Sequence, residues 1–128
     1  MAEARPGLRK AQQTYSASMT DFVTVTTTVD ESDKASGLAR GAVEARLAAC
    51  AQISDPVSSV YWWNGTLDTA REHVVTFKTT AALSDALVDY IKKTHPYDVP
   101  EVLVTPVLGG NDAYLSWVAS ETATQQQP

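Results

Sequence analysis

The chain has 128 residues, of which 44% are hydrophobic and 20% are charged, a composition typical of one globular domain with a buried core. Its formal net charge of -5 argues against a nucleic-acid partner, because nucleic acids are bound by clustered Lys and Arg. The single cysteine, Cys50, excludes an internal disulfide framework and a cysteine-rich zinc site, and no apolar run approaches the ~20 residues of a membrane span.

The two ends of the chain are polar and carry neither helical nor strand periodicity. Residues 1–20 are interrupted by Pro6-Gly7 and lack the apolar centre of a signal peptide. We therefore predict a mobile tail over residues 1–20, one folded domain over residues 21–120 and a disordered tail over residues 121–128. The expected compartment is the cytoplasm, with no membrane partner.

The first expected elements are a strand and a helix. Phe22–Val29 mixes Val and Phe with threonine, and these residue types favour a partly buried strand. Asp30 or Ser32 is predicted to cap the helix that follows over Asp33–Ala49. A stripe of small residues at helical spacing predicts close packing on a sheet: Ala35, Leu38, Ala42, Ala45 and Ala49. Cys50 is expected to end this helix as a small buried residue.

The dipeptide Asn64-Gly65 predicts a tight hairpin, since both residues tolerate the positive φ of a two-residue turn. This turn predicts three cross-strand pairs: Trp63 with Thr66, Trp62 with Leu67, and Tyr61 with Asp68. The arms would cover Ile53–Trp63 and Thr66–Thr76, with a bulge or an edge at Asp55-Pro56 because proline cannot donate to the ladder.

Large apolar side chains lie on both faces of this hairpin near its tip. Val60 and Trp62 share one face, and Tyr61 and Trp63 share the other, because side chains alternate along a strand. An isolated two-stranded ribbon is marginal in water, and an exposed apolar patch of this kind marks an interaction surface. We therefore expect the tip to be buried against another subunit.

A second amphipathic helix is expected over Ala81–Thr94. Its apolar stripe is Leu83, Ala86, Leu87, Tyr90 and Ile91. Pro96 ends this helix and favours an extended conformation at His95. A last strand is expected over Glu101–Leu108, and a short final helix over Ala113–Ser120. Asn111 or Asp112 would cap that helix, and four side chains would pack it onto the body: Tyr114, Leu115, Trp117 and Val118.

The resulting order of elements is β-α-β-β-α-β-α. The predicted fold class is α+β: a ferredoxin-like β-α-β-β-α-β sandwich with a long central hairpin and a short C-terminal helix. Both long helices would then cover one face of the sheet and leave the other face partly apolar. A trimer or another closed oligomer would cover that face.

Several motifs occur in an order that resembles one known family. They are Leu47-Ala48-Ala49-Cys50, Tyr61-Trp62-Trp63-Asn64-Gly65, Phe77-Lys78-Thr79-Thr80, His95-Pro96-Tyr97, Pro100-Glu101 and Tyr114-Leu115-Ser116-Trp117. Together they look like the CutA divalent-cation tolerance family, over about Asp21 to Val118. The resemblance implies a cytoplasmic homotrimer with the architecture of PII-like signalling proteins. It also implies a role in tolerance of copper and other divalent metals, without an established catalytic activity.

The resemblance also implies a set of copper ligands, which are a cysteine at the end of the first strand and a His-His pair before Pro-Tyr. Here Thr27 occupies the cysteine position and Thr94 the first histidine position, so only His95 of that set is present. A single imidazole is a weak transition-metal site unless other donors join it. Copper or zinc would therefore be held weakly, with His95 and Glu101 as the predicted ligands.

The segment from Thr94 to Glu101 is the predicted functional corner, because it brings an imidazole, a phenol and two carboxylates together. A cleft between subunits would take a small anion or a metal ion, lined by Lys78, His95, Tyr97, Glu101 and Trp63. Lys78 lies in a strand that we predict to be buried. A lysine there must extend its ammonium to water or pair it, and a carboxylate such as Glu101 would suit it. A purely structural interpretation stays open, with His95-Pro96 serving as a helix stop.

Three classes of function are consistent with these residues. The first is a trimeric metal-tolerance protein, which the resemblance favours. The second is a PII-like sensor that binds a small metabolite in its subunit clefts without a specific metal role. The third is an enzyme with His95 as a general base, which ranks last because the sequence has no nucleophile motif, no phosphate-binding glycine loop and no paired catalytic carboxylates. We expect a protein that is not an enzyme.

Overall fold

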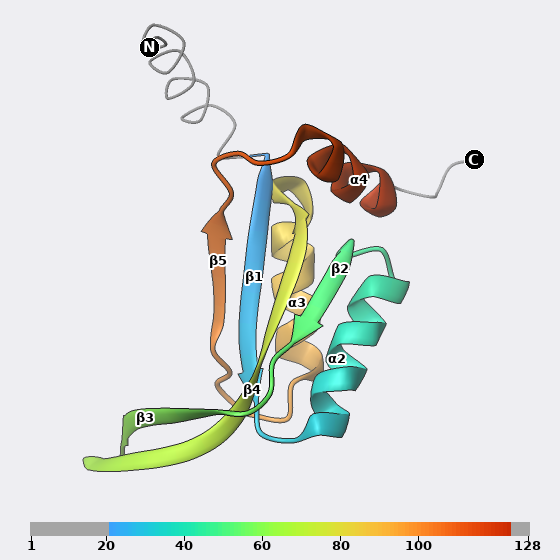
Figure 1. Ribbon diagram of the computed structural model, residues 1–128. Coiled ribbons are helices and arrows are strands. Elements are labelled where there is room, and N and C mark those ends of the chain that lie inside the picture. The colour runs from blue at the N-terminus through green and yellow to red at the C-terminus, as the bar shows by residue number, and fades with distance from the viewer. Residues whose placement is uncertain (1–20, 124–128) are drawn as a thin grey trace, which may run out of the picture.

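The computed structural model describes residues 21–123, which form one antiparallel sheet with helices packed on it (Figure 1). The sheet carries its strands in the order β2-β4-β1-β5, and β3 pairs with β4 outside this path. The strands are β1 (Phe22–Val29), β2 (Cys50–Ile53), β3 (Val57–Trp63), β4 (Thr66–Thr80) and β5 (Val102–Pro106). The helices in this part of the chain are α2 (Ser32–Glu44), α3 (Ser84–Thr94, after the short 3-10 turn Ala81–Leu83) and α4 (Asp112–Thr122).

The topology confirms the predicted ferredoxin-like fold. Both β1 and β2 are antiparallel to β4, so they run parallel to each other with β4 between them. The helix α2 connects β1 to β2, which makes the split β-α-β unit of this fold. The predicted tail over residues 1–20 lies outside the described residues.

The core lies between one face of the sheet and the helices α2 and α3. Alternate side chains of β1 and β4 point to this face, where Val25, Val75 and Phe77 are fully buried. The helices contribute fully buried residues that match the predicted stripes: Ala35 and Ala42 from α2, and Leu87 and Ile91 from α3. The other face of β1 and β4 is rich in partly exposed threonine, with Lys78 among them.

The helix α2 ends at Glu44, so the prediction of a helix to Ala49 is wrong. Arg46 adopts a left-handed φ of 63°, and the amide of Leu47 bonds back to the carbonyl of Ala42. This is the hydrogen-bond pattern of a Schellman C-cap, which ends a helix when one residue turns left-handed. Ala45 is consequently exposed, although the stripe placed it in the core.

Two local predictions next to α2 also require correction. The residue at the N-cap is Glu31, and no side chain caps the helix there, so neither Asp30 nor Ser32 has the predicted role. Cys50 begins strand β2 and is partly exposed, so it is not a fully buried residue at a helix end.

The hairpin has the predicted turn and the predicted register. Asn64 and Gly65 have φ values of 51° and 78°, and Trp63, Trp62 and Tyr61 face Thr66, Leu67 and Asp68. The first arm is broken into β2 and β3 at residues 54–56, as Asp55-Pro56 indicated. At the break the Ser54 hydroxyl accepts the amide proton of Val74 at 2.8 Å, which replaces a bond of the ladder.

The final helix, α4, runs through Thr122, two residues beyond its predicted end at Ser120. Asn111 caps it as expected, because its Oδ1 accepts the amide protons of Ala113 and Tyr114 at 2.9 and 3.4 Å. The side chains that pack inward are Leu115, Val118 and Thr122, whereas Tyr114 and Trp117 stay about 40% exposed against expectation. No helix within residues 21–123 is long and apolar enough to cross a membrane.

Candidate functional site

The predicted corner is built around His95, which is 8% exposed at the end of α3. Its Nε2 lies 2.8 Å from the carbonyl oxygen of Thr28, and its Nδ1 lies 3.1 Å from the amide nitrogen of Tyr97. A carbonyl only accepts and an amide only donates, so the ring proton is on Nε2 and the lone pair of Nδ1 faces Tyr97. Both ring nitrogens are therefore occupied, and the imidazole ties α3 to the end of β1.

The phenol of Tyr97 extends this network to the hairpin. Its hydroxyl donates to Glu72 Oε2 at 2.8 Å, and its ring packs on His95 with the centroids 4.6 Å apart. Burial raises the pKa of Tyr97 above its ordinary value, and the hydrogen bond to the Glu72 carboxylate raises it further. The phenol is thus held in its protonated form, in which it can donate.

Three further positions belong to the metal-site prediction, which are the two threonines at the family's ligand positions and the predicted ligand Glu101. Thr27 is fully buried, and its hydroxyl has no hydrogen-bond partner. The hydroxyl of Thr94 donates to the Tyr90 carbonyl at 2.7 Å, and Glu101 is exposed. Within residues 21–123 of one chain, no group of three or more His, Cys, Asp or Glu side chains is placed to hold a metal ion. Both nitrogens of His95 are bonded within the described residues, so a metal ion at this ring would have to replace one of these bonds.

Lys78 lies in a different part of the sheet from His95. It pairs in register with Thr24, whereas His95 contacts the carbonyl of Thr28, four residues further along β1. That offset corresponds to about 13 Å along a strand. Lys78 Nζ donates to Gln52 Oε1 at 2.7 Å, so the expected pair with Glu101 is absent. One chain therefore does not assemble the predicted cleft.

A second cluster of polar groups surrounds Lys78. Cys50, its partner in the β2–β4 register, has its Sγ 3.5 Å from the hydroxyl of Tyr114 on α4. This contact raises the pKa of the Tyr114 phenol above its ordinary value, with burial as the next cause. The sequence did not predict that Cys50, Lys78 and Tyr114 would meet, because 64 positions separate Cys50 from Tyr114.

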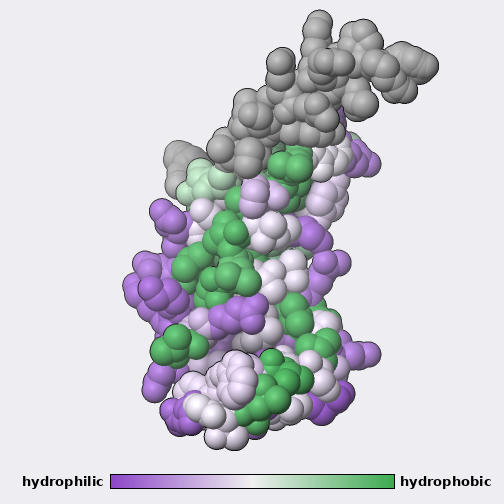
Figure 2. Space-filling model, turned by 90° about the vertical axis from the view of Figure 1, so that its left-hand side faces the viewer, coloured by the Kyte–Doolittle hydropathy of each residue, from purple (hydrophilic) through white to green (hydrophobic). Residues whose placement is uncertain are grey.

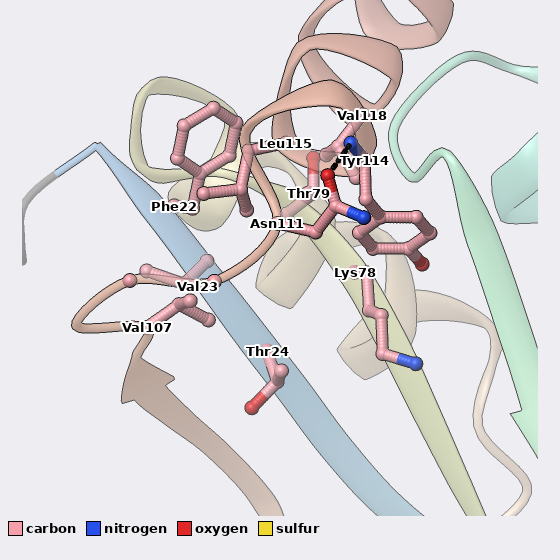
Figure 3. A pocket seen from close by; sticks show the side chains of 12 residues that line it. Phe22, Val23, Thr24, Lys78, Thr79, Val107, Asn111, Tyr114, Leu115 and Val118 are labelled. Carbon is pink, nitrogen blue, oxygen red and sulfur yellow. Dashed lines mark hydrogen bonds between the residues drawn. The ribbon is translucent and has the colours of Figure 1, made fainter.

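Next to this cluster is a cavity of about 200 Å³, between α4, the loop before it and the ends of β1 and β4 (Figure 3). Its walls are mainly apolar, and the side chains with polar groups among them are those of Thr24, Lys78, Thr79, Asn111 and Tyr114. The apolar wall is made by Phe22, Val23, Val107, Leu115 and Val118. Gly109 and Gly110 also line it. In the sequence, the glycine pair between a strand and an amphipathic helix indicates a turn. A turn alone does not predict that the start of β1, the end of β4 and α4 line a common cavity.

The hairpin tip and strand β5 carry the exposed apolar surface. Trp62 and Trp63 are 73% and 63% exposed at the tip, as the two-faced pattern predicted. Figure 2 shows hydrophobic side chains at the hairpin end and again higher on the same side of the molecule. On β5 and near it, the exposed apolar residues are Val99, Leu103, Val104 and Leu108. Trp63 pairs with Thr66, six residues along β4 from the Glu72 that contacts Tyr97, which places it about 20 Å from that contact along the strand.

The model of the family described as CutA1 divalent ion tolerance protein matches residues 23–121. The chain belongs to this family. Among its relatives is the chloroplastic protein CutA 1 of Oryza sativa subsp. japonica, 38% identical over 122 residues that cover 91% of this chain and 69% of the relative. The divalent-cation tolerance protein CutA of Pectobacterium atrosepticum is 38% identical over 98 residues, or 77% of this chain and 89% of the relative. The chain spans 55% of the Arabidopsis thaliana relative and 48% of the human one.

Solved CutA structures confirm the fold. The crystal structure of CutA1 from Oryza sativa superposes with a TM-score of 0.77 at 39% identity, covering 81% of this chain and 96% of that one. CutA from Synechococcus elongatus gives 0.78 at 38% identity, with 81% and 92% covered. The family is named for cation tolerance rather than for an enzymatic activity.

Proposed function

We propose that this CutA-family chain acts in divalent-cation tolerance as a cytoplasmic homotrimer that binds a metal ion or a small ligand in the clefts between its subunits. The observation that carries the proposal is the exposed apolar surface of the hairpin. Trp62 and Trp63 project into water in one chain, and β3 packs mainly on its hairpin partner β4. Such a surface is typical of a segment that is buried in an assembly.

The exposed edge strand β5 also supports assembly. Within residues 21–123 the strand β5 forms one edge of the sheet and pairs only with β1, and its Leu103 and Val104 are 58% and 44% exposed. An exposed apolar edge strand is a template for pairing with another chain, so proteins normally cover it. A hairpin of one subunit laid along β5 of the next would cover both surfaces and, repeated around a closed ring, would give the trimer.

The lack of a complete metal-ligand set within residues 21–123 supports a binding site between subunits. No group of three metal-binding side chains is available within residues 21–123, and His95 has no free ring nitrogen. A copper or zinc ion would therefore need donors from two subunits. Glu101 is the predicted ligand that remains exposed, and a neighbouring hairpin would bring Trp63 toward it. The role we propose is binding, not catalysis.

The PII-like alternative is a small-metabolite sensor without a specific metal role. It is favoured by one observation, which is that the polar cluster at Lys78 lies beside a cavity large enough for a small organic molecule. Metal and metabolite roles differ in their requirements: the first needs carboxylate donors from two subunits, whereas the second needs a pocket for an organic molecule and no specific metal donors.

Calorimetric titration with copper and with zinc tests the proposed function. The variants are Glu101→Gln, the double variant Trp62→Ser/Trp63→Ser, and Glu44→Gln as a control at an exposed carboxylate on α2. The proposal predicts that the wild type and the control bind metal equally, that Glu101→Gln binds more weakly, and that the hairpin variant loses both metal and assembly. Full binding by a hairpin variant shown to be monomeric would exclude a site between subunits.

A further inference from the structure

We propose that the cavity beneath α4 binds a small monocarboxylate with an apolar body, and that Lys78 receives the carboxylate. This inference does not depend on the tolerance role, because the cavity is formed by one chain. Three segments build it: the start of β1, the end of β4, and the loop with α4 that follows β5 (Figure 3). None of these segments belongs to the His95 corner.

The walls of the cavity determine the body of the ligand. Phe22, Leu115 and Val118 form an apolar lining that offers no hydrogen bond from its side chains. A polar body would lose its hydrogen bonds to water on entering, which is costly in an apolar space. The cavity volume of about 200 Å³ allows only a small body, such as a single ring or a short branched chain.

The polar groups beside these walls determine the head of the ligand. Lys78 is partly buried and donates to the neutral amide oxygen of Gln52, and no carboxylate within residues 21–123 forms an ion pair with it. A cation in this position can take an anion without first breaking a salt bridge. Figure 3 shows its ammonium below the ring of Tyr114, on the side of the cavity away from Phe22 and Val107.

Asn111 adds a second donor on the Tyr114 side of the cavity. Its Oδ1 accepts the amide protons of Ala113 and Tyr114, so its other terminal atom is the NH₂ group. In Figure 3 this nitrogen points toward the ring of Tyr114, next to the cavity. Lys78 and Asn111 both present donors, and two donors around an apolar space favour a carboxylate over a cation or a hydroxyl group.

The experiment is an NMR titration of the full chain with three matched probes. Benzoate has both the ring and the carboxylate, benzyl alcohol has the ring without the charge, and acetate has the charge without the ring. The variants are Lys78→Met, which keeps the apolar stem, and Leu115→Trp, which fills the cavity. Lys92→Met on the exposed end of α3 is the control for the loss of one positive charge.

The proposal predicts saturable benzoate shifts at the residues of the cavity, with a Kd on the order of millimolar for a ligand this small. Lys78→Met should weaken benzoate about threefold to fivefold and leave benzyl alcohol unchanged. Leu115→Trp should abolish the binding of benzoate and of benzyl alcohol, and Lys92→Met should leave the binding of both probes unchanged. Acetate alone should not saturate.

Three results would overturn the proposal. The first is that no probe shifts the cavity residues. The second is that benzoate and benzyl alcohol bind equally and Lys78→Met affects neither, which would mean an apolar cavity without anion recognition. The third is that benzoate binds only after Trp62→Ser/Trp63→Ser, which would mean that the hairpin of another copy fills the cavity. The oligomeric state, measured on the same samples, separates each result from a failure of the proposed function.

Discussion

His95 donates its Nε2 proton to the carbonyl of Thr28 at 2.8 Å, which joins the end of α3 to the end of β1. The same ring accepts the amide proton of Tyr97, so it fixes the first turn of the loop that leads to β5. Within one chain His95 therefore has a structural role, and its role as a metal ligand stays a prediction.

The first prediction concerns the stability that His95 provides. His95→Ala leaves the Thr28 carbonyl and the Tyr97 amide without partners in a buried place and should lower the free energy of unfolding by about 3 kcal/mol. Urea unfolding at a fixed chain concentration measures this, with His73→Ala as the control. His73 contributes one bond, to the Ser54 carbonyl, in a half-buried position, and its loss should cost about 1 kcal/mol.

Metal binding by the same variant distinguishes the two roles of His95. We expect the copper and zinc affinities of a folded His95→Ala protein to equal those of the wild type. A large loss of metal affinity with little loss of stability would show that His95 is a ligand after all.

The second prediction concerns how the stability of the fold changes at alkaline pH. The pKa of Tyr97 is raised in the folded chain by burial and by Glu72, so the unfolded chain releases this proton first as the pH rises. The unfolded state then binds fewer protons than the folded state, and stability falls with pH above about 10, the ordinary pKa of tyrosine. Tyr97→Phe should flatten this fall and lower the stability at neutral pH by about 1 kcal/mol. Parallel pH curves for the two proteins would contradict this account.

The third prediction compares two fully buried threonines. The Thr27 hydroxyl has no partner, whereas the Thr79 hydroxyl donates to the Leu47 carbonyl at 2.8 Å. Thr27→Val should therefore stabilise the protein by about 1 kcal/mol, and Thr79→Val should destabilise it by about 1–2 kcal/mol. Thermal unfolding of both variants checks the opposite signs. Destabilisation of equal size in both would mean that Thr27 has a partner in solution.

The fourth prediction compares two glycines of α2. A Cβ at Gly41 would collide with the hydroxyl of Tyr90, whereas a Cβ at Gly37 would meet no atom within 4 Å. Gly37→Ala should stabilise the helix by about 0.5–1 kcal/mol, and Gly41→Ala should destabilise the protein despite the same gain in propensity. Adding Tyr90→Phe to Gly41→Ala should recover part of the loss. Equal stabilisation by both glycine variants would contradict the close approach of Tyr90.

Local signals predicted most of the fold. The turn at Asn64-Gly65 fixed the hairpin register, because both residues take the positive φ that a two-residue turn requires. Pro106 lies at the end of the edge strand β5, because proline has no backbone N–H to donate to a neighbouring strand. These features depend on the chemistry of one or two residues.

The errors came from contacts between distant residues. The helix α2 ends where Arg46 turns left-handed, and its guanidinium binds Glu121 on α4 at 2.8 Å, 75 positions away. Lys78 pairs with Gln52 because β2 and β4 are adjacent, a choice of partner that no local pattern contains. The predicted cleft lies between subunits and stays a prediction, since within one chain Lys78 and His95 come from separate ends of the sheet.

Sedimentation equilibrium of the wild type and of Trp62→Ser/Trp63→Ser tests the central claim most directly. If the exposed hairpin completes a homotrimer, the wild type will have three times the chain mass at micromolar concentration, and the variant will dissociate while keeping its secondary structure. A wild type that sediments as a monomer at that concentration would contradict the proposed assembly and the site between its subunits.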